Sequence, residues 1–513
     1  MYGGDTNFSG STSPTLTQTV NAASTTTAVA SSANPSAFGQ SVTFTAMVAA
    51  TAPGAGTPRG TGTLSAGTAT FTTSSALNLG SHPITAAYGG SGSFNASTSA
   101  TLTETVNQAG STSALSSSAN PSVFGQSVTF TATVAAAAPG SGVPTGTVTF
   151  KDGATTLGTG ALSSGTATFV TSTLSAAAHS ITAVYGGDTN FGSSTSSTFT
   201  QTVNQDGSTT AVSSSQNPSV FGQSVTFTAT VTAAAPGSST PTGTVTFKDG
   251  VTTLGTGTLS GGTATFASSS LSVVAHSITA VYGGDTNFSG STSSTLIQTV
   301  NAASTTTALS SSANLTATVT ATAPASGTPT GTVTFKDGTT TLGTGTLSGS
   351  TATFTTSALA VGSHSITAAY GGGSGFNAST SSALTQTVNT ANTTTAVASS
   401  ANPSAFGQSV TFTATVAATA PGSGTPMGTV TFKDGATTLG ASTLTAGTAT
   451  FTTSALSVAS HSITAAYGGS GSFNASTSSA LAQTVNTAAT ATVVGSSQNP
   501  SVFGQIVTLT ATV

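Results

Sequence analysis

The stretch Ser127-Val-Thr-Phe-Thr-Ala-Thr-Val134 alternates strictly between hydroxyl and apolar side chains. Val128, Phe130, Ala132 and Val134 fall on one face, and Ser and Thr fall on the other. Because successive side chains of a β-strand point to opposite faces of the sheet, this pattern predicts a strand that buries one face and exposes the other.

Further strands are predicted around this stretch. Thr147-Val-Thr-Phe150 alternates again and is followed by Lys151-Asp152-Gly153, which predicts a hairpin because Gly supplies the positive φ that the turn requires. The other predicted strands cover residues 111–117, 157–162, 166–169, 180–185 and 197–203. About seven short strands without helical periodicity predict an all-β, immunoglobulin-like sandwich of two antiparallel sheets, with a closed barrel as the alternative.

The pattern recurs along the chain. A Tyr-Gly-Gly motif begins at Tyr2, Tyr88, Tyr185, Tyr282, Tyr370 and Tyr467, so successive copies lie 86, 97, 97, 88 and 97 residues apart. This period suits one complete sandwich domain and is too long for helical solenoid units. The predicted domains are the C-terminal remnant of a repeat at 1–21, repeats at 24–107, 111–204, 208–301, 304–389 and 392–486, and the N-terminal part of a further repeat at 490–513.

Two repeats are shorter than the others. The first, at Thr57-Pro-Arg-Gly-Thr-Gly-Thr63, lacks the Thr-Val-Thr-Phe-Lys-Asp-Gly hairpin. The fourth, at Ser312-Ala-Asn-Leu-Thr316, omits the Pro-Ser-Val-Phe-Gly-Gln segment and half of a strand. Losing a core strand costs more than a point substitution, so we predict that these two repeats are the least stable.

The linkers between repeats are three to six residues long, as in Val203-Asn-Gln-Asp-Gly-Ser208. Such short linkers predict an extended, semi-rigid array in which each repeat adds about 30–40 Å. Met1 and Val513 both fall inside predicted strands, which suggests a fragment of a longer array.

Composition excludes several classes of protein. Charged residues make up 3% of the 513 residues, with five Lys and Arg against nine Asp and Glu, so we expect no binding of nucleic acid. No apolar stretch approaches the roughly 20 residues of a membrane helix, and no signal peptide is visible. Cysteine is absent, which excludes disulfides and thiolate sites.

Three motifs in fixed order resemble those of bacterial Ig-like domains of group 3. They are Asn217-Pro-Ser-Val-Phe-Gly-Gln-Ser-Val-Thr-Phe-Thr-Ala-Thr-Val231, Pro241-Thr-Gly-Thr-Val-Thr-Phe-Lys-Asp-Gly250 and His276-Ser-Ile-Thr-Ala-Val-Tyr-Gly-Gly-Asp-Thr-Asn-Phe288. The resemblance covers essentially the whole chain, apart from the departures in the first and fourth repeats. It implies an exported bacterial protein, extracellular or at the cell surface, in which the repeats serve as spacers or adhesive modules. It supplies no catalytic residues.

The residues that could take part in catalysis or metal binding are interpreted as structural. One histidine occurs per repeat (His82, His179, His276, His364 and His461), and none has a metal ligand or an acidic residue beside it in sequence. The Asp-Thr-Asn segments at Asp188–Asn190 and Asp285–Asn287 offer too few carboxylates for calcium and are expected to be turns.

Lysines and sequons receive the same interpretation. Each hairpin lysine follows a core Phe and should therefore face outward; these are Lys151, Lys248, Lys336 and Lys433. An intramolecular Lys–Asn isopeptide bond needs a buried lysine, so none is expected. Sequons at Asn95, Asn377 and Asn474 arise readily in a Thr-rich chain. We therefore expect no catalytic, metal or cofactor site.

The sequence favours a non-catalytic stalk or spacer that could also be adhesive. The alternatives are a multivalent module that binds a cell-surface glycan or protein weakly, and the accessory repeats of a larger extracellular enzyme. Glycan sites commonly use exposed aromatic platforms, whereas Trp is absent and the Tyr of each repeat falls on a predicted core strand.

Overall fold

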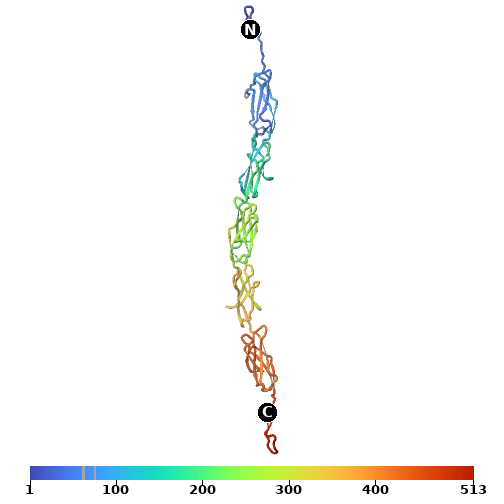
Figure 1. Ribbon diagram of the computed structural model, residues 1–513, viewed down its shortest axis with the longest axis vertical. Helices are drawn as coiled ribbons and strands as arrows, with labels where there is room; N and C mark the ends of the chain where they lie inside the picture. Colours follow the sequence, from blue (N-terminus) through green and yellow to red (C-terminus); the bar gives the residue numbers. More distant parts are fainter. Residues whose placement is uncertain (60–63, 74–76) are drawn as a thin grey trace. The chain divides into compact units, whose positions relative to one another are not determined.

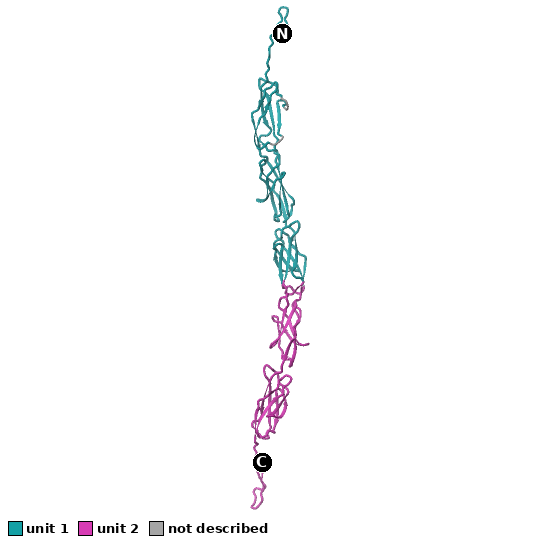
Figure 2. Ribbon diagram, turned by 180° about the vertical axis from the view of Figure 1, so that it is seen from behind, with its two compact units in different colours: residues 1–217, 225–268, 275–298 teal, residues 218–224, 269–274, 299–513 magenta. Residues whose placement is uncertain are grey.

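The computed structural model describes residues 1–59, 64–73 and 77–513, and the regular secondary structure of these residues is β-strand. The colours of Figure 1 follow the sequence and locate each repeat. Residues 1–217, 225–268 and 275–298 form one compact unit, and residues 218–224, 269–274 and 299–513 form a second (Figure 2). Among the described residues, no helix is long and apolar enough to cross a membrane.

The second repeat, in the first unit, shows the complete domain. Its strands are β9 (Ser111–Ser117), β10 (Ser122–Val123), β11 (Val128–Ala136), β12 (Thr147–Asp152), β13 (Thr155–Ala161), β14 (Thr166–Thr171), β15 (Ala178–Tyr185), β16 (Ser194–Thr195) and β17 (Phe199–Asn204). One sheet has the order β14-β11-β9, and the other has the order β10-β17-β15-β12-β13 with β16 paired to β15. The two sheets share no strand, which confirms the predicted sandwich over the barrel.

The core lies between these sheets. Val128, Phe130, Ala132 and Val134 of β11 are at most 2% exposed, as the alternation predicted. Opposite them, the second sheet contributes five fully buried side chains: Val148, Phe150, Ile181, Ala183 and Tyr185. Burying an aliphatic or aromatic side chain of this size stabilises the fold by roughly 1.5–3 kcal/mol, so this core accounts for the cohesion of the two sheets.

One strand pairing differs from the antiparallel pattern expected from the sequence. The two-residue strand β10 pairs with β17 in parallel, with Ser122 opposite Val203 and Val123 opposite Asn204. After β9 the chain crosses from the first sheet to the edge of the second, where it runs in the same direction as β17. A strand of two residues carries no periodicity, which is why the sequence pattern did not reveal it.

The predicted hairpin is present as β12 and β13, which pair with Asp152 opposite Thr155. Gly153 in the turn has a φ of +54°, the left-handed value that favours glycine. At the start of the hairpin, the ring of Phe150 stacks on Phe169 of the other sheet, with 5.7 Å between centroids. The hairpin therefore fills the space between the sheets as well as extending one of them.

The third repeat has β18 (Ser208–Ser214), β19 (Ser219–Val220), β20 (Val225–Ala233), β21 (Thr244–Asp249), β22 (Thr252–Thr258), β23 (Thr263–Ser268), β24 (Ala275–Tyr282), β25 (Ser291–Thr292) and β26 (Leu296–Asn301). The fifth repeat, in the second unit, has β35 (Thr393–Ser399), β36 (Ser404–Ala405), β37 (Val410–Ala418), β38 (Thr429–Asp434), β39 (Thr437–Thr443), β40 (Thr448–Thr453), β41 (Ser460–Tyr467), β42 (Ser476–Thr477) and β43 (Leu481–Asn486). Its sheets, β35-β37-β40 and β36-β43-β41-β38-β39, repeat those of the second repeat.

The first repeat has a reduced second sheet. Its strands are β1 (Thr25–Ser31), β2 (Ser36–Ala37), β3 (Thr43–Ala50), β4 (Thr68–Thr72), β5 (Gly80–Ile84), β6 (Ala87–Tyr88), β7 (Ser97–Thr98) and β8 (Leu102–Asn107). They form the sheets β1-β3-β4, β2-β8-β5 and β6-β7. Of the shortened segment Thr57–Thr63, residues 60–63 lie outside the described part. A cavity of about 520 Å³, lined by Phe44, Phe71 and Ile84 among others, opens into the core of this repeat.

The fourth repeat retains the hairpin, in which β29 pairs with β30 as β12 pairs with β13 in the second repeat. Its strands are β27 (Thr305–Ser311), β28 (Leu315–Ala321), β29 (Thr332–Asp337), β30 (Thr340–Thr346), β31 (Thr351–Phe354), β32 (Gly362–Tyr370), β33 (Ser379–Thr380) and β34 (Leu384–Val388). At the chain ends, Tyr2 and Ser11 form a single bridge, and β44 (Val493–Ser496) pairs with β45 (Leu509–Thr512).

Candidate functional site

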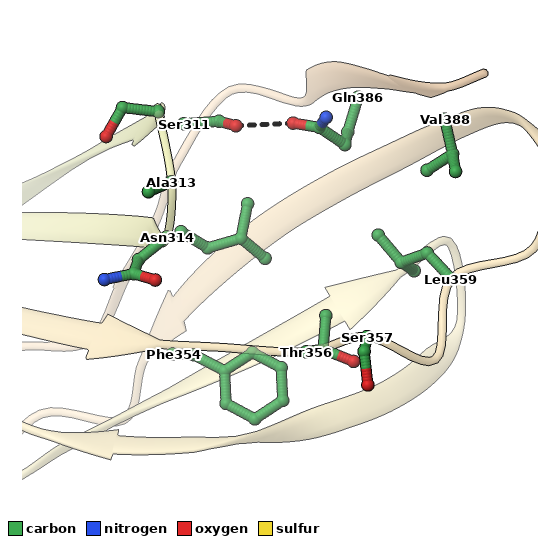
Figure 3. A pocket seen from close by; sticks show the side chains of 11 residues that line it. Ser311, Ala313, Asn314, Phe354, Thr356, Ser357, Leu359, Gln386 and Val388 are labelled. Atoms are coloured by element: carbon green, nitrogen blue, oxygen red, sulfur yellow. Dashed lines mark hydrogen bonds between the residues drawn. The ribbon is translucent and has the colours of Figure 1, made fainter. Parts of the chain in front are cut away.

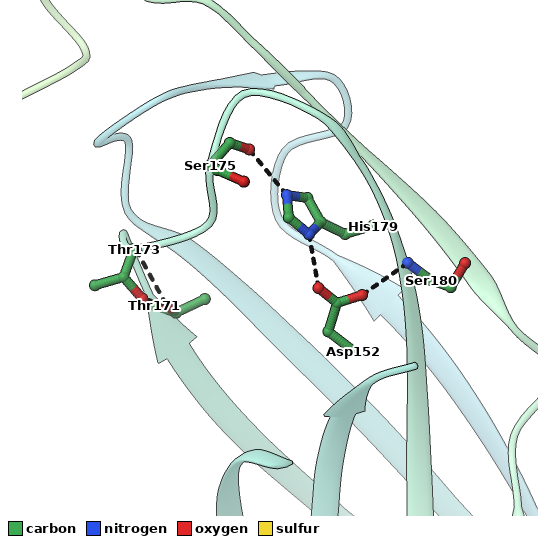
Figure 4. Close-up of polar contacts among 6 residues, drawn as sticks. All are labelled: Asp152, Thr171, Thr173, Ser175, His179 and Ser180. Atoms are coloured by element: carbon green, nitrogen blue, oxygen red, sulfur yellow. Dashed lines mark hydrogen bonds and ion pairs between the residues drawn. The ribbon is translucent and has the colours of Figure 1, made fainter. Parts of the chain in front are cut away.

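A histidine and an aspartate from different strands meet in each of the four repeats that keep the hairpin. Figure 4 shows the pair in the second repeat, where Nδ1 of His179 lies 2.7 Å from Oδ2 of Asp152. Nε2 of His179 lies 2.8 Å from the carbonyl oxygen of Ser175, and the backbone N–H of Ser180 donates to Asp152. The equivalent pairs are His276–Asp249, His364–Asp337 and His461–Asp434, at 2.6–2.7 Å.

The partners of the ring determine its charge. A carboxylate and a backbone carbonyl can only accept hydrogen bonds, so both ring nitrogens of His179 must donate, which requires the imidazolium form. Burial would lower the pKa of His179, but the hydrogen bonds to Ser175 and Asp152 outweigh it and raise the pKa. In the fifth repeat, the Ser457 carbonyl and Asp434 likewise raise the pKa of His461 against the effect of burial.

This arrangement stabilises structure and lacks the geometry of a catalytic site. A histidine that activates a serine needs a free ring nitrogen facing the hydroxyl, whereas Nε2 of His179 faces a backbone carbonyl. The described residues contain no group of three or more His, Cys, Asp or Glu that could hold a metal ion. In the first repeat, Nε2 of His82 lies 2.7 Å from the Asn78 carbonyl, and the deletion has removed the counterpart of Asp152.

The Asp-Thr-Asn segments form turns. Oδ1 of Asp188 accepts the backbone N–H groups of Asn190 and Phe191, and Oδ2 accepts the N–H and the hydroxyl of Thr145 at 2.8 and 2.7 Å. Burial alone would raise the pKa of Asp188, but these four hydrogen bonds lower it to about 2. Both carboxylate oxygens are therefore occupied in holding the loop, and Asp285 repeats the pattern with Thr242.

The remaining candidates of the sequence are the lysines, the tyrosines and the sequon asparagines. Lys151 is half-buried on β12, next to the fully buried Phe150. The tyrosine of each repeat is at most 8% exposed, and burial beside Asp188 raises the pKa of Tyr185 to about 12. The sequon asparagines are exposed, and the amides of Asn95 and Asn377 donate to the linker carbonyls of Ala22 and Ala302.

Sequence reasoning missed the contacts of the linkers. Between β8 and β9, the N–H of Ala109 donates to Asn190 and the N–H of Gly192 donates to Ala109, at 3.0 and 2.8 Å. The side chain of Gln108 donates to the carbonyl of Asp188 at 2.9 Å. In the sequence, an alanine or aspartate lies two residues before the first strand of each repeat. This regularity could have pointed to the linker contacts, but a single small residue does not identify its partner.

The fourth repeat has a pocket of about 190 Å³ where the second repeat is closed (Figure 3). Leu359, Gln386 and Val388 line it, and Ser311 donates a hydrogen bond to Gln386. In the second repeat, β10 and Val203 lie at this place and leave only about 10 Å³. The pocket thus follows from the missing Pro-Ser-Val-Phe-Gly-Gln segment.

The strands, cores and repeated motifs together define a chain of tandem immunoglobulin-like domains. The family model of the bacterial Ig-like domain (group 3) matches residues 29–107, 115–204, 212–301, 300–389 and 397–486. The chain belongs to this family, as the three motifs predicted. Domains of this kind are typically non-catalytic.

The solved structures that match this chain include fibronectin(III)-like modules of CbhA from Clostridium thermocellum. The match has 15% identity, covers 37% of this chain and 92% of that chain, and has a TM-score of 0.16. Domains A168–A170 of titin match with 11% identity over 54% of this chain and 99% of that chain, with a TM-score of 0.24. No curated protein matches the chain.

Proposed function

We propose that the chain is a non-catalytic spacer, or stalk, in an exported bacterial protein that acts outside the cell or at its surface. The observation that supports this proposal is that the linkers are short and are hydrogen-bonded to the repeat that follows them. Only residues 108–110 separate β8 from β9, and residues 205–207 separate β17 from β18. Because Ala109 exchanges hydrogen bonds with Asn190 and Gly192, the chain enters the next repeat along a defined path, as a spacer requires.

The side-chain chemistry supports the same role. Two ionisable groups of the second repeat are engaged by internal partners: His179 by Asp152, and Asp188 by Thr145 and its own turn. Because these contacts recur in several repeats, we interpret them as contacts that hold the fold of each repeat and not as a single binding or catalytic site. The membership of the family fits an extracellular setting.

Small-angle X-ray scattering of the purified chain tests the spacer role. The expected result is a thin particle whose maximum dimension corresponds to about 30–40 Å per repeat. A second chain that ends at Thr390 lacks the fifth repeat and residues 490–513, and it should be shorter by at least one such increment. A compact particle whose maximum dimension does not change with the number of repeats would overturn the spacer role.

Adhesion is the second candidate, with a cell-surface glycan or protein as the ligand. Repeated weak sites gain strength through avidity. Phe71 and Phe406, which are 65% and 56% exposed, are aromatic side chains that a ligand could contact. The buried tyrosines weaken this candidate, because they leave few aromatic platforms for sugar rings. A glycan array probed with the full chain tests it, with Phe406→Ala as the matched variant. Binding that this variant reduces would favour adhesion, and an array without any signal would count against a glycan ligand.

A further inference from the structure

Three Phe-Gly-Gln loops contact the repeat that follows them in sequence. In each case the phenylalanine meets, edge to face, the phenylalanine of the loop after Tyr-Gly-Gly. The ring pairs are Phe38–Phe191 at 5.7 Å and 84°, Phe124–Phe288 at 5.4 Å and 86°, and Phe221–Phe376 at 5.3 Å and 84°. Such T-shaped pairs stabilise by about 0.5–1.5 kcal/mol beyond the area they bury.

A hydrogen bond accompanies each ring pair. The hydroxyl of a serine in the following repeat donates to the carbonyl of the motif glycine, in the pairs Ser141–Gly39, Ser238–Gly125 and Ser326–Gly222. The contact is close, because a Cβ atom on Gly39 would lie 2.0 Å from the carbonyl oxygen of Ser141. The glycine thus allows the approach of the two backbones.

We propose that the Phe-Gly pair is a docking loop that fixes each repeat to the next one, and that its partner surface is the serine and phenylalanine just described. The partner is thus another immunoglobulin-like repeat of this chain. Between the second and third repeats, the amide oxygen of Asn287 also accepts the N–H of Ala176 at 3.0 Å. The inference rests on these contacts and is independent of the proposed spacer role.

The fifth repeat provides an internal comparison. Its Phe473 and Ser423 occupy the partner positions, but the fourth repeat lacks the Phe-Gly-Gln motif. Phe473 is accordingly half-buried, whereas Phe191, Phe288 and Phe376 are 2%, 1% and 5% exposed. Burial of this phenylalanine therefore follows the presence of a docking loop in the preceding repeat.

The Phe-Gly loop of the fifth repeat has the same backbone conformation as the docking loops. Phe406 is 56% exposed, and a Cβ atom on Gly407 would meet none of the described residues within 4 Å. The φ of Gly407 is +75°, against +78° for Gly125.

The junctions between repeats should therefore differ in flexibility. The junction between the second and third repeats carries a ring pair and two hydrogen bonds, so it should hold one orientation. The junction between the fourth and fifth repeats has the linker but no docking loop, so it should act as the hinge. Relative motion is the default for domains joined by a short linker without an interface.

Pairs of spin labels on the full chain test this difference by double electron–electron resonance. The natural chain has no cysteine, so Thr168→Cys with Thr265→Cys reports on the junction of repeats two and three. Thr353→Cys with Thr450→Cys, at equivalent exposed positions, reports on the junction of repeats four and five. The distance distribution is expected to be about two to three times wider at the second junction. Equal widths at the two junctions would overturn the proposal.

Two substitutions at the docking contact and one control test whether the contact itself restricts the motion between repeats two and three. Phe124→Ala should widen the distribution between repeats two and three, whereas the matched Phe406→Ala should leave both distributions unchanged. Ser238→Ala, which leaves the core of the second repeat intact, should widen the same junction to a smaller degree. If Phe124→Ala and Ser238→Ala both leave the width unchanged, the docking loop does not fix the junction.

Discussion

Nδ1 of His179 lies 2.7 Å from an oxygen of Asp152, a residue 27 positions earlier in the chain. This contact joins β15 to the end of β12 and uses the aspartate of the hairpin turn. Because the second ring nitrogen donates to the Ser175 carbonyl, the histidine is held as a cation. His364 and His461 have the same two contacts, so we expect the stability of the second, fourth and fifth repeats to depend on pH.

The raised pKa of His179 gives the sign of this dependence. A group whose pKa is higher in the folded state stabilises the fold fully below its ordinary value of 6.5, and this stabilisation declines as the pH rises through the raised value. We expect the free energy of opening of β15 to fall accordingly between neutral and alkaline pH. Hydrogen exchange of residues 178–185, corrected for the intrinsic effect of pH, measures it.

Asp152→Asn is the matched variant for this prediction. It should lower the protection of β15 by about 1–3 kcal/mol at pH 6 and remove most of the pH dependence. Residues 460–467 of the fifth repeat, which keep the His461–Asp434 pair, serve as the internal control. An unchanged pH dependence of β15 in the variant would show that the pair does not couple protonation to folding.

Glu104 should be replaceable by glutamine with a gain in stability. Its side chain is fully buried, Oε1 accepts a 2.8 Å hydrogen bond from Ser36, and Oε2 has no partner among the described residues. Gln201, at the same place in the second repeat, donates its amide to the carbonyl of Ala119 at 2.9 Å. We expect Glu104→Gln to stabilise the first repeat by about 1–3 kcal/mol, because it removes a buried carboxylate and adds a donor.

The reverse substitution, Gln201→Glu, is the control for Glu104. It should destabilise the second repeat by a similar amount, because it places a carboxylate where a buried amide donates hydrogen bonds. Thermal unfolding of the full chain, followed by hydrogen exchange of each repeat, assigns the change to its domain. A first repeat that is less stable in the Glu104→Gln variant than in the natural chain would contradict the account of the buried carboxylate.

The sequence predicted the strands because their periodicity is strong. The alternation of Val128, Phe130, Ala132 and Val134 is long enough to identify a half-buried strand, and all four side chains are buried. The Asp-Gly turn was predicted for the same kind of reason, since its conformation depends on its own residues. Local patterns therefore sufficed for the sandwich and for the family.

The long-range contacts could not be predicted in this way. The pairing of His179 with Asp152 depends on the register between β12 and β15, and the sequence neighbours of His179 are Ala178 and Ser180. The contact of Phe124 with Phe288 depends on how one domain meets the next, which no period within a repeat encodes. Both motifs were visible in sequence, but their partners were not.

Asp206 should destabilise the third repeat at neutral pH. Its side chain is 2% exposed, and burial raises its pKa. A carboxyl group whose pKa is raised by folding favours the folded state at low pH, and this advantage is lost as the pH rises through the raised value. Asp206→Ala, which copies the alanine found at Ala109, should therefore stabilise the repeat near pH 7.

The gain from Asp206→Ala should shrink as the pH is lowered through the raised pKa of Asp206, because the carboxyl group of the natural chain takes up its proton there. Chemical denaturation at several pH values, with hydrogen exchange of residues 208–214 as the local readout, follows it. A gain of the same size at every pH would mean that the alanine acts through packing and not through charge.

The two shortened repeats remain predicted as the least stable, and the structure suggests an order between them. The first repeat has an open cavity of about 520 Å³, and its Phe71 is 65% exposed. The fourth keeps Val333 and Phe335 fully buried and has a pocket of only about 190 Å³. Limited proteolysis of the full chain should cleave first in repeat one and next in repeat four, and equal resistance of all five repeats would refute the prediction.

Gly158 on β13 should be intolerant of even a methyl group. A Cβ atom at this position would lie 2.3 Å from the ring edge of Phe169, which is itself stacked on Phe150. Gly158→Ala must therefore displace a ring that joins the two sheets, and we expect a loss of about 1–3 kcal/mol in the stability of the second repeat. Gly186→Ala is the control, because a Cβ atom there meets none of the described residues within 4 Å.

A double variant separates crowding from backbone effects at Gly158. Phe169→Leu alone should destabilise the repeat, but Gly158→Ala should cost less in its presence, because the smaller side chain leaves room for the methyl group. The difference between the two costs, measured by hydrogen exchange of β13, is the coupling between the two residues. If Gly158→Ala costs as much in the Phe169→Leu background as in the natural chain, the glycine is required for its backbone and not for the ring above it.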